Sequence, residues 1–240
     1  MQFKKHILLL CSLLILLSCK KDIEISFTNI DVTTKNNTLV SINIPFAQGD
    51  ENVSKKINSE IDQVIISAIE IEEPNHSKSE TIEESIDRFN KAYNEFNTQF
   101  PDTTGPWEVQ IDGEVLVSNP KLTSISITSY TNTGGAHGNT SINFLNFNSV
   151  TGEKLSLEDI FNDLLAFKNI AKEYFDQAIK DKNGLFNPET FELPENIGFT
   201  KEGVILLYNS YEIAPYSTGI IEFTIPIEKI SKLLAINSTN

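Results

Sequence analysis

Apolar and polar residues alternate along several stretches of the chain, which is the pattern of β-strands that bury one face. The first two stretches are separated by a Lys-Asn-Asn turn and predict an opening β-hairpin that we expect Pro45 to end. The next three predict strands of one antiparallel sheet. In the first of these, Asp112-Gly113 permits a tight turn or a β-bulge, and a bulge is favoured because the preceding arm is short. The predicted strands are 25–34, 39–44, 107–117, 122–132, 140–148, 197–200, 204–208 and 220–225.

Apolar residues at three- and four-residue spacing predict the helices. Asp50 is placed to cap a helix that runs to about Glu72, ahead of Pro74. Thr81 and Glu84 have the spacing of a capping box for the next helix. The remaining helices are predicted at 156–161, from there to about 182, and after the proline at 226.

The order of these elements indicates the α+β class, with antiparallel sheets and helices packed on one face. We expect two tightly associated subdomains, at residues 25–105 and 106–240. The hydrophobic content of 40% in 240 residues is sufficient for a substantial core.

Residues 1–18 have the features of a lipoprotein signal peptide. Lys4 and Lys5 precede an apolar run at 7–17, whose length suits an export signal better than a membrane span. The ending Leu-Leu-Ser-Cys resembles a bacterial lipobox, so we expect Cys19 to be lipidated and 19–24 to form a tether. An ordinary secretory peptide with a chance cysteine is the alternative. A lipid-anchored protein of the cell envelope is expected, at the outer membrane and facing the periplasm or the surface.

The charge and the cysteine content of the chain limit which binding partners and which metal or disulfide sites can be expected. The chain has 33 acidic and 19 basic residues, a net charge of −14, which becomes −16 when Lys4 and Lys5 leave with the signal (33 against 17). Such a surface repels nucleic acid and attracts cationic partners, although a charge that serves solubility explains it equally well. Because Cys11 and Cys19 are the only cysteines, the body has no disulfide and no thiolate metal site.

Three ordered motifs carry a family resemblance: TGGAHG at 133–138, FNxxTGxxLxLxDIF at 147–161 and YEIAPYxxG at 211–219. They resemble a family of bacterial domains of unknown function found in the extracytoplasmic region of the anti-sigma factor RsiV and beside the deacetylase domain of PdaC. The N-terminal half, with IxIP at 42–45 and a helix that contains Asn58, resembles the companion domain that precedes it in both. Together the match covers about 25 to 236.

The resemblance implies a binding role. RsiV is a lysozyme receptor, and lysozyme-like muramidases are cationic, so a −16 domain would attract them. Because no sigma-binding segment, transmembrane helix or deacetylase domain is evident in the sequence, we expect neither signalling nor deacetylation to carry over. The predicted function is a non-catalytic envelope binding module for such a muramidase or for envelope glycan, and the alternative is an enzyme acting on envelope polysaccharide.

The candidate binding residues lie in and beside two loops. We call 133–138 the glycine loop and 211–219 the tyrosine loop. His137 either presents its ring to a ligand or fixes its loop by bonding a carbonyl, and the tyrosines either dock a partner or cap the core. No spaced metal partner of His137 is evident and no nucleophile-elbow pattern occurs, so no catalytic residue, metal or cofactor is assigned. The candidates are Tyr130, Gly134, Gly135, His137, Gly138, Tyr211, Pro215 and Tyr216.

Overall fold

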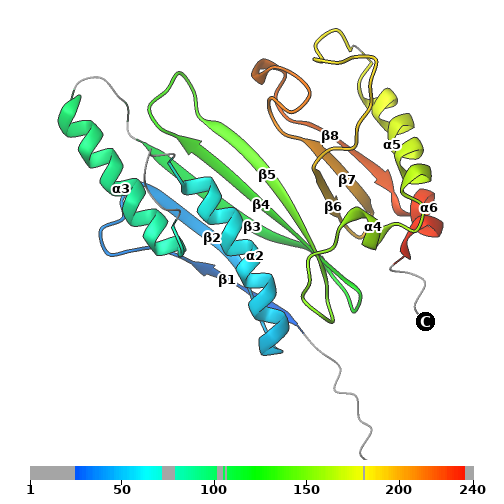
Figure 1. Ribbon diagram of the computed structural model, residues 1–240, viewed down its shortest axis with the longest axis horizontal. Coiled ribbons are helices and arrows are strands. Elements are labelled where there is room, and N and C mark those ends of the chain that lie inside the picture. The colour runs from blue at the N-terminus through cyan, green and yellow to red at the C-terminus, as the bar shows by residue number, and fades with distance from the viewer. Residues whose placement is uncertain (1–24, 72–78, 102–104, 106, 181, 236–240) are drawn as a thin grey trace, which may run out of the picture.

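The computed structural model describes residues 25–71, 79–101, 105, 107–180 and 182–235. The predicted signal peptide at 1–18, Cys19, the tether at 19–24, His6 and His76 lie outside the described residues. The elements are β1 (Ser26–Asp31), β2 (Val40–Gln48), α2 (Glu51–Ile69), α3 (Ile82–Gln99), β3 (Glu108–Ser118), β4 (Leu122–Asn132), β5 (Asn139–Asn148), α4 (Leu157–Ile160), α5 (Leu164–Ala178), β6 (Asn196–Phe199), β7 (Gly203–Tyr208), η1 (Tyr216–Thr218), β8 (Ile221–Pro226), α6 (Ile227–Ile230) and η2 (Ser231–Leu233) (Figure 1).

The first sheet has five strands in the order β1-β2-β3-β4-β5. Neighbouring strands are antiparallel except β2 and β3, which are parallel because α2 and α3 carry the chain back between them. The predicted α+β class is confirmed, with one parallel pair in a mostly antiparallel sheet. The subdomain boundary predicted between 105 and 106 falls between strands of this same sheet.

Helices α2 and α3 lie across one face of the first sheet, as Figure 1 shows. The Asp50 carboxylate caps α2 as predicted, and the Thr81 hydroxyl accepts from Glu84 N–H. The predicted capping box is incomplete, because the Glu84 carboxylate accepts from the Glu80 N–H and not from that of Thr81. The apolar stripe of α2 is buried against the sheet at Val53, Ile57, Ile61, Ile65 and Ile69. Burying these five aliphatic side chains contributes ~1.5–3 kcal/mol each to the N-terminal core, which apolar residues of α3 and of the sheet complete.

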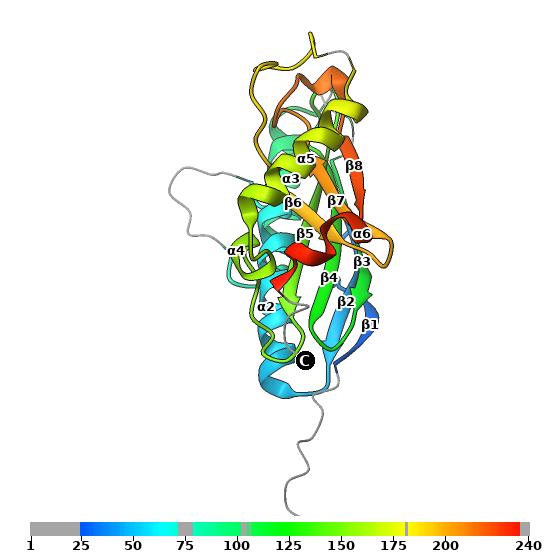
Figure 2. The ribbon, with the colours of Figure 1, turned by 90° about the vertical axis from the view of Figure 1, so that its right-hand side faces the viewer.

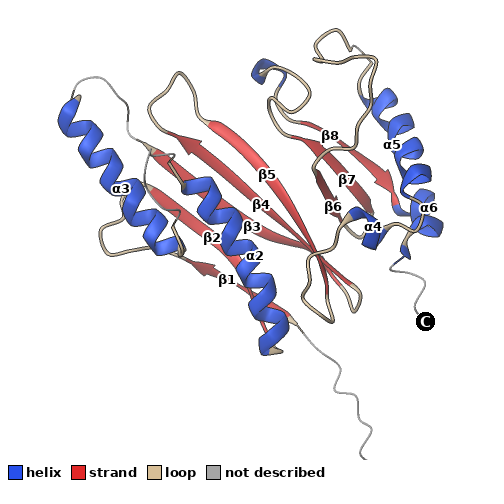
Figure 3. Ribbon diagram, viewed as in Figure 1, coloured by secondary structure: helices blue, strands red, loops and turns tan. Residues whose placement is uncertain are grey.

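The second sheet is antiparallel and short-stranded, in the order β6-β7-β8 (Figure 3). Its core forms against α5, whose buried residues Phe167, Ala171 and Phe175 follow the predicted spacing. Figure 2 turns this unit toward the viewer, with α5 and α6 beside β7 and β8. Among the described helices, none is both long and apolar enough to cross a membrane.

Two side-chain amides continue the first sheet where its strands lack a neighbour. The amide of Asn209, which follows β7, accepts from the N–H of Ile142 and donates to its carbonyl, both at 2.9 Å. Asn58 on α2 bonds Ala47 of β2 in the same two-point way, at 2.8 and 3.0 Å. Each amide therefore substitutes for one residue of a missing strand, and Asn209 joins the second sheet to β5.

The structure corrects two predictions about strands. Pro45 does not end the second strand, because β2 continues to Gln48. The ladder to β3 stops at Asn43, so the N–H that proline lacks falls on a side of β2 with no strand to bond. The β3 irregularity lies between Val115 and Val117 and not at Asp112-Gly113. Gly113 is instead a point of close packing, since a Cβ there would lie 2.4 Å from the Pro45 ring.

Candidate functional site

The glycine loop connects β4 to β5, which confirms the predicted hairpin. Gly134 has φ 79°, a conformation that glycine favours, and its N–H donates to the Asn132 side chain at 3.0 Å. Gly138 is buried, and a Cβ there would lie 2.4 Å from the Tyr130 ring. Tyr130 therefore packs directly on the loop backbone, and glycine is required because nothing larger fits beneath the ring.

His137 is exposed and lies against the tyrosine loop. Its ring stacks on Tyr216, with ring centroids 3.7 Å apart and an interplanar angle of 13°. The His137 Nδ1 is 2.9 Å from the Gly138 carbonyl, and the Tyr216 hydroxyl donates to the same carbonyl at 2.8 Å. The two loops, about 80 residues apart in sequence, thus form one surface.

Tyr211 extends this surface with an exposed ring. Its ring lies 5.7 Å from that of Tyr216, and the residue is 57% exposed. Tyr211 has φ 72°, the one positive φ outside glycine among the described residues. The Glu212 carboxylate maintains this turn by accepting from the N–H of Asn209 at 2.9 Å and of Glu195 at 3.1 Å. Strain of this kind gathers at ligand sites, so its presence under an exposed aromatic residue supports a functional reading.

A groove of about 790 Å³ lies beside this aromatic surface. One side is formed by α2, with Gln63 and Ser67, and the rim by the glycine loop and Tyr211. Its floor is the end of β4 and β5 next to the glycine loop, and it presents short polar side chains, of which Ser129 is buried. These are Ser129, Thr131, Asn139, Ser141 and Asn143.

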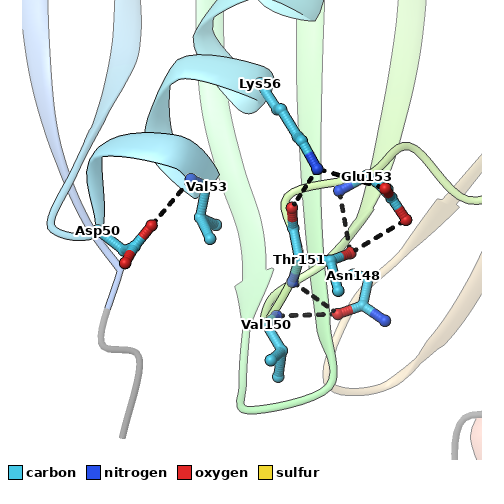
Figure 4. Close-up of polar contacts among 7 residues, drawn as sticks. All are labelled: Asp50, Val53, Lys56, Asn148, Val150, Thr151 and Glu153. Atoms are coloured by element: carbon cyan, nitrogen blue, oxygen red, sulfur yellow. Dashed lines mark hydrogen bonds and ion pairs between the residues drawn. The ribbon is translucent and has the colours of Figure 1, made fainter. Parts of the chain in front are cut away.

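The turn after β5 docks on the first turns of α2 (Figure 4). The Asn148 side chain accepts from two backbone N–H groups of this turn, and Lys56 donates to the Thr151 carbonyl at 3.1 Å. Gly152 has φ 70°, and a Cβ there would lie 2.6 Å from the Val53 carbonyl oxygen. These contacts explain the FNxxTG motif, which sets the distance between α2 and β5.

Charge within the groove is balanced. Glu60 and Lys154 line the groove and pair at 3.2 Å. Among the described residues, no group of three or more His, Cys, Asp and Glu side chains converges as a metal site would require. At the base of the tyrosine loop, burial raises the pKa of Tyr208, and the carboxylates of Glu212 and Glu192 add to this effect. The groove therefore offers neutral hydrogen-bonding groups, apolar side chains at Val64 and Ala68, and the exposed rings of His137 and Tyr211.

The structure brings most candidate residues together. Tyr130, His137, Gly138, Tyr211 and Tyr216 form one continuous contact set. Gly135 lines the groove, Gly134 shapes the turn, and Pro215 is exposed at the start of η1.

Sequence reasoning missed the polar groove itself. The available signal was that Ser129 and Thr131 occupy the strand face on which Ile125 and Ile127 are buried. A polar residue on a core face marks the place where the covering helix ends.

Taken together, these features define a class: an α+β protein of two sheets that a side-chain amide joins, with a groove between α2 and the β4–β5 floor whose lining includes residues of three loop motifs. Comparison with known families supplies the particular assignment. Residues 32–140 match the family described as "Deacetylase PdaC", and residues 158–228 match "Protein of unknown function (DUF3298)". The chain therefore carries a PdaC-family segment followed by a DUF3298 segment, and the resemblance inferred from the motifs is confirmed.

Two solved structures share the fold. A DUF3298-family member from Bacteroides fragilis has 22% identity and a TM-score of 0.56, covering 88% of this chain and 93% of that one. A DUF3298-family protein from Pseudomonas aeruginosa has 19% identity and a TM-score of 0.52, covering 88% of this chain and 94% of that one. No curated protein matches the chain.

Proposed function

We propose that this protein is a non-catalytic binding module of the cell envelope, anchored through a lipidated Cys19, whose ligand docks in the groove beside the tyrosine loop. One observation carries the proposal. Tyr211 is exposed at a strained φ of 72° over a groove whose lining includes residues of three sequence motifs. A fold that maintains an exposed aromatic residue at an energetic cost supports a role in ligand contact.

The arrangement of the groove favours binding over hydrolysis. Glycoside hydrolysis ordinarily uses two carboxyl groups about 5 to 10 Å apart. Of the described groove-lining side chains, Glu60 is the single carboxylate, and it is paired with Lys154. His137 stacks on Tyr216 and contacts a backbone carbonyl, with no acidic group among its bonded partners. The envelope-polysaccharide enzyme is therefore the weaker alternative.

A cationic protein such as a lysozyme-like muramidase is the second candidate ligand. The supporting observation is the net charge of −14, or −16 for the mature chain, which would accelerate association with a basic partner. This charge acts over the whole surface, and the groove itself is nearly neutral. Binding by this route is accordingly expected to weaken steeply with salt and to depend little on Tyr211.

The test is affinity capture from envelope extract by the full-length protein in a detergent without a sugar headgroup. Tyr211→Asn removes the ring and keeps a residue that tolerates positive φ. Phe186→Ala removes an equally exposed ring, 54% accessible, outside the groove lining. If Tyr211→Asn abolishes capture and Phe186→Ala preserves it, the proposal that the ligand docks in the groove is supported. Capture unchanged by Tyr211→Asn, or no capture at all, overturns it. A muramidase retained only at low salt by both variants favours the second candidate.

A further inference from the structure

The chemistry of the groove identifies its ligand class more closely, on the premise that the groove is the binding site. The floor and the α2 side present hydroxyl and amide groups beside the apolar side chains of Val64 and Ala68. The hydroxyls of Ser129 and Thr131 already donate to the Ser141 and Ala68 carbonyls, so toward a ligand they act as acceptors. A ligand that matches them must itself carry many neutral donors and acceptors. Apolar side chains or fatty acyl chains would leave such groups unpaired, and an unpaired polar group weakens binding.

The charges of the groove exclude a strongly ionic ligand. Glu60 and Lys154 are 3.2 Å apart and neutralise each other, in a chain whose net charge is −14. A polyanion would meet the repulsion of the whole protein, and a polycation would find no concentrated negative charge in the groove. Neutral hydrogen bonding is therefore the main source of specificity.

Tyr211 supplies the apolar part of the site. Its ring is exposed at the rim and is supported by Tyr216, which in turn stacks on His137. An aromatic face beside short polar groups fits a molecule with one apolar face and hydroxyl groups around its edge. A pyranose ring has this form, since its axial C–H bonds gather on a face and its hydroxyl groups project outward.

We infer that the groove binds an uncharged oligosaccharide segment, with one sugar ring stacked on Tyr211 and the neighbouring rings bonded by the floor of β4 and β5. Thr131 and Asn143 lie on adjacent strands of that floor and are the specificity-determining residues. The Glu60–Lys154 pair limits the far end of the bound segment.

The probe is a β-1,4-linked N-acetylglucosamine tetramer titrated into full-length protein in the same detergent, followed by calorimetry. The comparison ligand is a polygalacturonate oligomer of the same length, which carries a carboxylate on each ring. The neutral tetramer is expected to bind, and the charged oligomer to bind at least about tenfold more weakly.

Variants of Tyr211 then distinguish the loss of its aromatic ring from a loss of folding. Tyr211→Phe retains the ring and is expected to change affinity by less than about threefold, whereas Tyr211→Asn weakens it about tenfold or more. Phe186→Ala is the matched control and leaves affinity unchanged. A thermal scan establishes that each variant is folded.

The failure of this inference is distinguishable from failure of the binding role. If Tyr211→Asn abolishes envelope capture but neither oligosaccharide binds the wild type, the sugar assignment is overturned and the binding module remains. Equal binding of both oligomers, or binding insensitive to Tyr211→Asn, also overturns it. Ring-dependent binding of the neutral tetramer establishes it.

Discussion

Asn209 makes the sharpest test of how the two sheets are joined. Its amide makes two hydrogen bonds to the backbone of Ile142, both at 2.9 Å, and it begins the turn that carries Tyr211. Asn209→Ala removes both bonds and leaves a half-buried N–H and carbonyl of β5 without them. At about 0.5–1.5 kcal/mol for each bond, plus the cost of a desolvated partner, the free energy of unfolding should fall by about 2–3 kcal/mol.

Asn209→Asp adds a control of nearly identical shape. A carboxylate still accepts from the Ile142 N–H, but it repels the Ile142 carbonyl to which the amide donates. Because this contact disfavours the charged form, the folded-state pKa of the new carboxyl should lie above its unfolded value of about 3.9. The stability deficit is therefore smallest below about pH 4 and grows as the pH rises through the folded-state pKa.

The measurement is urea unfolding of wild type, Asn209→Ala, Asn209→Asp and the exposed helical control Asn97→Ala, at about pH 7 and pH 4. The alanine variant should also melt about 5–10 °C lower than wild type. The control should stay within about 0.5 kcal/mol of wild type. A loss below about 1 kcal/mol for Asn209→Ala, or a deficit of Asn209→Asp that does not depend on pH, would refute the role assigned to the amide.

Three further predictions concern the loops. Gly152→Ala places a side chain at φ 70°, where its Cβ would lie 2.6 Å from the Val53 carbonyl oxygen. The free energy of unfolding, measured by urea titration, should therefore fall by about 2–4 kcal/mol. An unchanged free energy would contradict the docking of this turn on α2. Gly138→Ala drives a Cβ to 2.4 Å from the Tyr130 ring and should cost about 1–3 kcal/mol, part of which a second change, Tyr130→Ala, restores; a double variant no more stable than the single one would argue against the clash. Tyr208→Phe deletes a hydroxyl that donates to a backbone carbonyl at 2.6 Å and should cost about 1 kcal/mol near pH 7. Since burial raises the pKa of Tyr208 above the unfolded value of about 10, wild type should lose stability as the pH rises beyond that value, and the phenylalanine variant should lack this loss. If wild type and Tyr208→Phe lost the same unfolding free energy as the pH rises above about 10, the role given to the Tyr208 hydroxyl would be contradicted.

Local signals in the sequence were sufficient for most elements. The strand predicted at 122–132 has the bounds of β4, and the side chains of Asp50 and Thr81 cap the helices that follow them, as expected from their positions. These features depend on neighbours within four residues, which sequence patterns record directly.

The errors arose where a distant segment decides the outcome. Whether Pro45 ends a strand depends on how far β3 pairs with β2, and no local pattern contains that information. The bulge expected at Gly113 was displaced because the glycine accommodates the Pro45 ring instead. The candidate residues of the glycine and tyrosine loops could be named from their composition. Their convergence depends on contacts between distant segments, such as that of Asn209 with β5 across 67 residues and that of Tyr216 with Gly138.

The amide contacts also limit how readily the edge of the first sheet can pair with another molecule. The last strand of an open sheet is a template for a strand from another molecule, and such pairing leads to aggregation. Along the outer edge of β5, individual residues already bond the backbone groups. The Asn209 amide bonds the N–H and the carbonyl of Ile142, and the Asn196 side chain accepts from the Phe144 N–H. The Asn146 carbonyl accepts from the N–H of Leu155, beyond the turn that follows β5. A strand from another copy would therefore find few free backbone groups along this edge, because the side chains of Asn209 and Asn196 already bond it.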